Sequence, residues 1–260
     1  DITRSQEVYH YALSNHLTYM FVPQQDRMVS KMNSVEIIAG LPIIEIQATQ
    51  LFGVGRVWKR LMDIVVGSVV LLLLSPIMLL VAIIMKLSAP REAVFFRQTR
   101  LTRFNREFRI YKFRSQKSKY NGTTPEEAFT MMGRPELIKQ YRDNGDQLDN
   151  DPRITRLGRF LRATSLDELP QLLNVVKGDI LLVGSRALIP QEINQYKRKD
   201  TILAVKSGLT GLAQVSGRRD ISFEERRHLD VYYVQNWSLW LDIRILVKTF
   251  GMVLFQRGAR

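Results

Sequence analysis

The longest apolar run in the chain extends from Ile64 to Met85 without a single charge. It covers 22 positions, with Asp63 directly before it and Lys86 directly after it. A helix needs ~20 apolar residues to cross the hydrocarbon core of a bilayer. Helices inside soluble proteins rarely stay apolar on every face over such a length. The run therefore predicts a membrane helix, and a helix buried in a soluble core is the weaker alternative.

Ser75-Pro76 divides this run into two arms, each only ~18 Å long at 1.5 Å per residue. Proline removes a backbone hydrogen bond and clashes with the preceding turn, so we expect a sharp bend there. The Ser75 hydroxyl can bond the carbonyl that Pro76 leaves free. Basic residues, which favour the cytoplasmic side, flank both ends of the run: Arg56, Lys59, Arg60, Lys86, Arg91, Arg97 and Arg100. We therefore predict a re-entrant helix-break-helix over residues 60–88, with a kinked full span as the alternative.

The region before the apolar run contains short strand-like segments at 17–22 and 35–46, the second broken by Gly40 and Pro42. They are too few to close a sheet of their own. The chain starts at Asp1 rather than Met, with no signal peptide ahead of it. We expect residues 1–55 to be the end of an upstream α/β domain plus a linker, and residues 56–260 to form the main domain.

The remaining pattern predicts several short elements. Residues 94–113 alternate apolar and basic side chains, which indicates a β-hairpin with its turn near Phe104-Asn105. Further along, we expect a helix near 135–141, a basic helix face over 153–162, a short buried strand before Gly184, a glycine-rich loop at 207–217 and helical structure over 223–255. The fold class is therefore mixed α/β (α+β), a mostly helical membrane-associated domain with a small β-hairpin or sheet.

Charge and composition narrow the partners. The net charge is +13, from 38 Lys and Arg against 25 Asp and Glu. Beside a membrane helix, such an excess suits anionic lipid and phosphate-bearing ligands. No nucleic-acid motif is present, so we expect no nucleic-acid partner. The chain has no cysteine, which excludes disulfides and thiolate chemistry, and its three histidines are too scattered for a metal cluster.

The sharpest chemical feature is the segment from Ser165 to Leu173, which reads SLDELPQLL. Pro170 fits the first turn of a helix, which would place Asp167 near the N-cap and Glu168 in the first turn. On this interpretation the pair is structural: Asp is a favoured cap, and Ser165 with Glu168 could form a capping box. The functional interpretation is equally specific. An ionised carboxylate can attack phosphorus or bind Mg²⁺ beside phosphate oxygens, so both interpretations stay open.

Several motifs carry a family resemblance and occur in one order along the chain: KRLMD at 59–63, SP at 75–76, FRQTR at 96–100, IYKFRS at 110–115, DPRITRLGRFLRATSLDELPQLLNVVKGDILLVGSR at 151–186 and SGLTGLAQVSGR at 207–218. Together they resemble the bacterial sugar transferases, the monotopic polyprenyl-phosphate phosphoglycosyl transferases of exopolysaccharide, O-antigen and glycan assembly. The resemblance runs from about Trp58 to the C-terminus. It also suggests that residues 20–55 end the nucleotide-fold accessory domain found in long members of the family.

The resemblance implies an enzyme that transfers a hexose-1-phosphate from a UDP-sugar to undecaprenyl phosphate and releases UMP. Asp167 would be the nucleophile that holds the phosphosugar covalently, and Glu168 would position Mg²⁺ or assist proton transfer. Both carboxylates would hold the metal. The family's re-entrant hairpin would lie in the bacterial inner membrane, broken at Ser75-Pro76, with the catalytic domain on the cytoplasmic face. The partners would be UDP-sugar, undecaprenyl phosphate and membrane lipid. Whether the upstream region also pairs two subunits in a homodimer stays open.

Phosphate and uridine contacts are expected from arginines, because a guanidinium can grip two phosphate oxygens at once. The first choices are Arg114, Arg153 and Arg218, and the second choices are Lys112, Arg100 and Arg162. Asp63 is expected to pair with a nearby basic residue rather than to take part in chemistry. The alternative function is a non-catalytic membrane scaffold that binds anionic lipid, in which the Asp167-Glu168 pair is only a helix cap.

Overall fold

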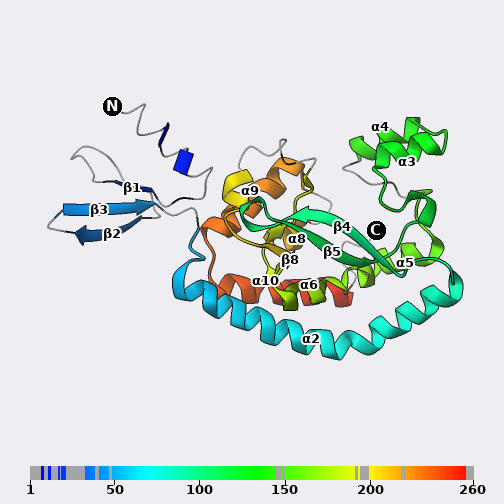
Figure 1. The fold of residues 1–260 in the computed structure, drawn as a ribbon, viewed down its shortest axis with the longest axis horizontal. Coiled ribbons are helices and arrows are strands. Elements are labelled where there is room, and N and C mark those ends of the chain that lie inside the picture. Colours follow the sequence, from blue (N-terminus) through cyan, green and yellow to red (C-terminus); the bar gives the residue numbers. More distant parts are fainter. Residues whose placement is uncertain are drawn as a thin grey trace.

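The structure is a computed structural model of the 260-residue chain. It describes residues 7–8, 11–12, 17, 19–21, 33–38, 41–46, 49–144, 148, 150–190, 193, 199–217 and 221–255. Figure 1 shows one long helix along one side of the main domain and a small separate sheet at the N-terminal end. The fold is mixed α/β and mostly helical, as the sequence predicts.

The long helix is α2, which runs from Gly53 to Ser88. Among the described residues it is the one helix long and apolar enough to cross a membrane, with a mean hydropathy of 2.8 over its most apolar window. Only 11% of that window is buried inside the protein, whereas a core helix would be mostly buried. The exposed apolar surface of α2 therefore indicates membrane association and argues against the soluble-core alternative.

The predicted break at Ser75-Pro76 is not seen, because α2 continues through Pro76. Figure 1 shows instead a helix that curves gently and turns both ends toward the rest of the domain. The predicted compensation is confirmed: the Ser75 hydroxyl donates 2.8 Å to the carbonyl of Leu72, the group that lacks an N–H partner because residue 76 is proline. This local repair explains how the helix stays continuous. The re-entrant path through a bilayer stays a prediction.

Strands occur in the N-terminal region where the sequence predicts them. They form an antiparallel sheet in the order β1-β3-β2, with bounds β1 Tyr19–Phe21, β2 Asn33–Ile38 and β3 Leu41–Ile46. Pro42 does not break the second segment, because it lies within β3 opposite Ile37. Among the described residues β1 pairs with residues 44–46 and does not reach Pro42, whose missing N–H therefore interrupts no described ladder on that side. The assignment of this sheet to an upstream domain stays a prediction.

Two further sheets support the main domain. The predicted hairpin is confirmed as β4 Phe95–Leu101 and β5 Glu107–Phe113. Its turn is the short helix η1 Arg103–Asn105, where Phe104 and Asn105 both have a φ of 58°. The third sheet is parallel in the order β6-β8-β7, with bounds β6 Leu181–Val183, β7 Ser185–Arg186 and β8 Ser207–Thr210. All three residues of β6 are buried, as predicted for the strand before Gly184.

The prediction of a glycine-rich loop at 207–217 is wrong. This stretch forms β8, followed by helix α8 Leu212–Gly217. A Cβ on Gly208 would lie 2.1 Å from the backbone nitrogen of Gly184, and one on Gly211 would lie 2.1 Å from the carbonyl oxygen of Gly184. These glycines therefore allow close backbone packing between β8 and the end of β6, which accounts for them without an anion.

The remaining helices surround the sheets. Their bounds are α3 Pro125–Met131, α4 Glu136–Asp143, α5 Arg156–Ala163, α6 Gln171–Lys177, α7 Lys199–Ile202, α9 Phe223–Gln235 and α10 Leu239–Phe255. The predictions of a helix near 135–141 and of helical structure over 223–255 are confirmed. The main core joins β5, β6, α6, α9 and α10, and the N-terminal half of α2 packs on it through Val66 and Val70.

α10 is tied to α2 by a cluster of fully buried charges. Lys59 Nζ lies 2.8 Å from Asp63 and 3.0 Å from Asp242, and none of the three side chains is exposed. Asp242 also accepts hydrogen bonds from the Tyr233 hydroxyl at 2.8 Å and the Trp237 indole at 3.1 Å. The prediction that Asp63 pairs with a nearby base is confirmed. We call Lys59, Asp63 and Asp242 the buried triad.

Candidate active site

The Asp167-Glu168 pair lies in a single 3₁₀ turn, η3 Leu166–Glu168, between α5 and α6. The predicted register is wrong: α6 begins at Gln171, and Pro170 rather than Asp167 is its N-cap. Ser165 has a left-handed backbone with a φ of 58° and makes no side-chain cap, so the predicted capping box with Glu168 is absent. A capping box therefore does not explain why two acids stand here, although both lie in the first turn of η3.

The electrostatics of Asp167 distinguish it from an ordinary surface acid. Its side chain is buried, with 8% of the residue exposed. Burial, followed by the negative charge of Glu168, raises the pKa of Asp167 to about 6, against the opposing charges of Lys112 and Arg162. At pH 7 such a carboxyl is still about 90% ionised. It is also more basic than a free aspartate, which favours nucleophilic attack.

Lys112 reaches the site from β5. Its ammonium lies 2.7 Å from a carboxylate oxygen of Glu168, and both side chains are partly exposed. This contact joins positions 56 residues apart in the sequence. Lys112, predicted as a second-choice ligand contact, is therefore placed beside the pair, where its charge also favours the ionised form of Asp167.

Arg162 lies on the last turn of α5. Its Nε donates 2.9 Å to the hydroxyl of Ser115, and its charge lowers the pKa of Asp167. Arg156 and Arg159 lie on the same helix and are exposed, as predicted for a basic helix face. Arg153 precedes this helix and does not extend the face. The two cations that the structure brings to Asp167 are thus Lys112 and Arg162.

The two described first-choice arginines make buried contacts within the protein, and their role as ligand contacts stays a prediction. Arg114 is buried, pairs with Glu92 at 2.7 Å and donates to the carbonyls of Ala93 and Gln116. Arg153 is buried against Asp151, with a closest approach of 2.6 Å, and lies over the Phe129 and Tyr141 rings of α3 and α4. These contacts join loops and helices, so both arginines hold the fold.

Of the remaining predicted arginines, Arg100 lies away from the Asp167-Glu168 pair. Arg100 donates a 3.1 Å hydrogen bond to the carbonyl of Ala187 and also contacts Gln98. It lies four positions along β4 from Phe96, the residue that pairs with Lys112. Arg218 lies outside the described residues, and its role stays a prediction.

The pair lies close to the membrane helix. Leu166, directly before Asp167, packs on a cluster formed by Val81 and Met85 of α2 with Phe113 and Leu161. Val81 and Met85 lie in the C-terminal half of α2, whereas the buried triad lies near its N-terminal end. α10 also carries exposed apolar side chains, including Trp240 and Phe250, which suit a helix at a membrane surface.

The donor set can be tested against the predicted magnesium ion. No group of three or more His, Cys, Asp or Glu side chains within the described part of the chain could hold a metal on its own. Mg²⁺, however, commonly takes one or two carboxylates and completes its shell with water and substrate phosphates. Asp167 and Glu168 fit that role if Glu168 releases Lys112, and such a metal would supply charge neutralisation of a diphosphate.

The structure thus brings together a buried carboxylate with a raised pKa, a second carboxylate and two cations, near the long apolar helix α2. In the comparison with known protein families, the family described as "Bacterial sugar transferase" matches residues 54–256. The chain belongs to the bacterial sugar transferase family.

Curated relatives extend this result. The chain is 43% identical over 206 residues to the UDP-galactose-lipid carrier transferase of Erwinia amylovora, covering 79% of this chain and 42% of the relative. It is 33% identical over 258 residues to the UDP-glucose:undecaprenyl-phosphate glucose-1-phosphate transferase of Escherichia coli, covering 96% and 51%. It is 39% identical to the exopolysaccharide production protein ExoY of Rhizobium meliloti, covering 79% and 89%. The chain thus spans about half the length of the first two relatives and most of ExoY.

Proposed function

We propose that the chain transfers a hexose-1-phosphate from a UDP-sugar to undecaprenyl phosphate at the cytoplasmic face of the bacterial inner membrane, in exopolysaccharide, O-antigen or glycan assembly. The observation that carries this proposal is the state of Asp167, which is buried, raised in pKa and not used as a helix cap. Two relatives whose names specify transfer from a UDP-sugar to a lipid carrier support the substrate class.

In the first step, an Asp167 carboxylate oxygen attacks the β-phosphorus of the UDP-sugar. The bond from that phosphorus to the bridging oxygen breaks, and UMP leaves with its electron pair. Asp167 now carries the sugar phosphate as an acyl phosphate. In the second step, a phosphate oxygen of undecaprenyl phosphate attacks the same phosphorus, which frees Asp167 and forms the lipid diphosphate sugar.

The neighbouring side chains have separate roles in this scheme. Lys112 and Arg162 keep Asp167 ionised and face the phosphoryl oxygens as negative charge moves onto the leaving group. Glu168 holds Lys112 in place at 2.7 Å before substrate arrives. Asp167 and Glu168 are the residues that would hold a Mg²⁺ ion, which would supply charge neutralisation of the diphosphate. The packing of Leu166 on the α2 cluster supports transfer to a lipid phosphate, because it holds Asp167 next to the apolar helix.

The direct test is UMP release by the purified full chain in lipid nanodiscs, with a panel of UDP-sugars, Mg²⁺ and undecaprenyl phosphate. The proposal predicts UMP formation with at least one UDP-hexose, a lipid diphosphate sugar as co-product, and only a single-turnover burst of UMP when the acceptor is omitted. Turnover without any covalent burst would support direct transfer instead. Absence of UMP with every donor would favour the scaffold alternative.

A further inference from the structure

A cavity of about 510 Å³ lies at the N-terminal end of α2, and neither carboxylate of the Asp167-Glu168 pair lines it. Among the twelve described residues that line this cavity, five are cations and none is an acid. The cations are Arg56, Lys59, Arg60, Arg103 and Lys206. We call this the cationic pocket.

Lys59 alone among the five has carboxylate partners, because it belongs to the buried triad. Arg60 donates 2.7 and 2.8 Å to the carbonyls of Val175 and Val176, Arg103 donates 3.0 Å to that of Ala204, and Lys206 donates to that of Gly178. Carbonyls satisfy hydrogen bonds but cancel no charge. Arg56 makes no ion pair or side-chain hydrogen bond with any described residue. Four positive charges therefore lack a counter-charge in the pocket lining.

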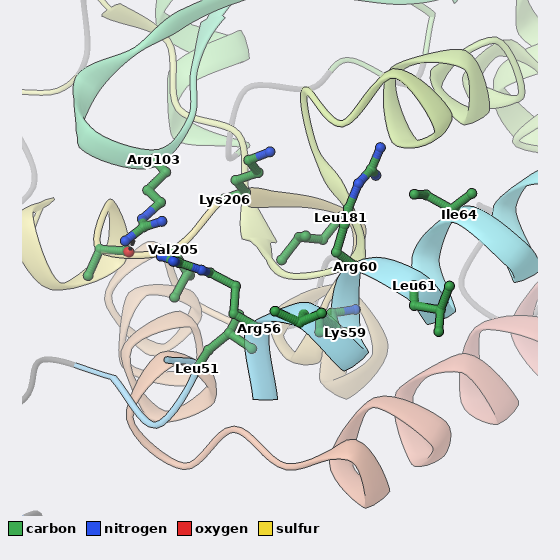
Figure 2. A pocket seen from close by; sticks show the side chains of 12 residues that line it. Leu51, Arg56, Lys59, Arg60, Leu61, Ile64, Arg103, Leu181, Val205 and Lys206 are labelled. Carbon is green, nitrogen blue, oxygen red and sulfur yellow. Dashed lines mark hydrogen bonds between the residues drawn. The ribbon is translucent and has the colours of Figure 1, made fainter. Parts of the chain in front are cut away.

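Burial and the neighbouring positive charges act in the same direction on the pKa values of two of these cations. Burial, followed by the charge of Arg56, lowers the pKa of Arg103. Burial, followed by the charges of Arg60 and Arg106, lowers the pKa of Lys206 even though Asp179 opposes the effect. An anion in the pocket would relieve this repulsion. Figure 2 shows the guanidinium groups of Arg56 and Arg103 pointing toward one another, from α2 and from the β4–β5 turn.

The apolar part of the lining indicates which kind of molecule bears the anionic group. Apart from its cations, the pocket is lined by apolar side chains, including Leu51, Leu181 and Val205. It opens onto Val57 and Leu61 of α2, which are 68% and 50% exposed on the apolar surface assigned above to the membrane. A soluble nucleotide would leave this apolar wall without a partner. A phosphate with an attached hydrocarbon chain fits both the cationic and the apolar side chains of the lining.

We propose that the cationic pocket binds an anionic membrane phospholipid, with its headgroup phosphate between Arg56 and Arg103 and an acyl chain along Leu61 and Ile64. The site is separate from the Asp167-Glu168 pair. Ile64 and Val81, which mark the two positions on α2, are on the order of 25 Å apart along the helix axis. The bound lipid anchors the end of α2 that enters the bilayer, whether or not the chain transfers sugar phosphate.

The test uses the full chain in phosphatidylcholine nanodiscs that contain a minor fraction of photoreactive phosphatidylglycerol, with crosslinked peptides mapped by mass spectrometry. The proposal predicts crosslinks within residues 51–64. Arg56→Gln, which removes an exposed side chain without described partners, should lower them roughly tenfold, as expected for one charge-assisted contact. Arg103→Gln should do the same, and Arg103→Lys should retain most of the signal. Thermal melting of each variant checks the fold.

Arg91→Gln is the matched control, because Arg91 is exposed and lies just past the other end of α2. It should leave the crosslinks at 51–64 unchanged. An equal loss in Arg91→Gln would reduce the effect to diffuse attraction between a basic protein and an anionic surface. Displacement of the lipid by stoichiometric undecaprenyl phosphate would assign the pocket to the acceptor, and displacement by UMP would assign it to the nucleotide. Any of these three results overturns the phospholipid assignment.

Discussion

Two clusters, each of two carboxylates and a lysine, lie near different ends of α2: the buried triad, and Lys112 with the Asp167-Glu168 pair. They differ in how their charges are satisfied. In the buried triad, Lys59 contacts both Asp63 and Asp242, and Asp242 also accepts bonds from a tyrosine and a tryptophan. At the other cluster, Lys112 contacts Glu168, while Asp167 keeps a pKa raised to about 6. The same residue types hold two helices together in one place and, on the proposed function, supply the nucleophile in the other.

The comparison is tested most strongly by Asp167→Asn. The substitution removes the proposed nucleophile and keeps the side chain's size, so UMP release should fall on the order of 10⁴-fold. Stability should not fall, because ionised Asp167 is destabilising above pH 6 by up to roughly 3 kcal/mol and Asn carries no charge. Kinetics and thermal melting of the same sample measure both effects. A variant that melts much earlier would place Asp167 with the structural carboxylates.

Lys59→Met is the opposite case, with a large effect on stability. It leaves Asp63 and Asp242 together in a fully buried site without their cation, which should cost about 3–5 kcal/mol. Chemical denaturation in detergent measures this loss. Turnover per folded molecule should change little, since Lys59 is remote from Asp167. If Lys59→Met melts like the unaltered protein, the triad does not hold α10 on α2.

Lys112→Met makes the matched change in the second cluster. Its ion pair is partly exposed, and such pairs contribute only about 0–1 kcal/mol, so stability should be almost unchanged. Turnover should nevertheless fall by about 10²-fold, because a charge that faces the transferred phosphoryl group is lost. Lys112→Arg should restore part of it. A variant that loses stability and keeps turnover would reverse the roles assigned to the two lysines.

The smallest effect is expected in the pH dependence. The pKa of Asp167 is raised in the folded protein, so the ionised fraction falls as the pH drops through about 6. The rate of the UMP burst without acceptor should therefore decline about tenfold per pH unit below that value. By the same shift, the contribution of Asp167 to stability is greatest below about pH 4 and is lost as the pH rises through 6. A burst that persists unchanged at pH 4.5 would contradict the raised pKa.

Much of the fold follows from local sequence patterns. The apolar run, the alternation over 94–113 and the KRLMD motif predict α2, the hairpin and the Lys59–Asp63 pair, because each depends on residues close together in the chain. Asp242, 183 residues from Lys59 in the sequence, could not be assigned to the triad in this way. The continuous path of α2 was missed because Pro76 was expected to break the helix. The Ser75 hydroxyl instead compensates for the missing N–H of Pro76 at the carbonyl of Leu72.

The site was predicted less completely than the fold. The Asp167-Glu168 pair was visible as adjacent acids, but its relation to α6 was wrong by several residues because Pro170 caps the helix instead of lying inside it. Arg114 and Arg153 were chosen for their chemistry alone. The Asp151 carboxylate two residues before Arg153 was a local signal for a structural ion pair. No local signal identifies Lys112, since its partner Glu168 is reached only through the packing of β5 on η3.

Mass spectrometry of the protein after brief exposure to a UDP-sugar, without undecaprenyl phosphate, tests the central claim most directly. The account predicts a phosphosugar on Asp167 that is released by hydroxylamine, absent from Asp167→Asn, and discharged on addition of undecaprenyl phosphate. A protein that turns over and never carries this adduct, or carries it on Glu168 instead, would contradict the account.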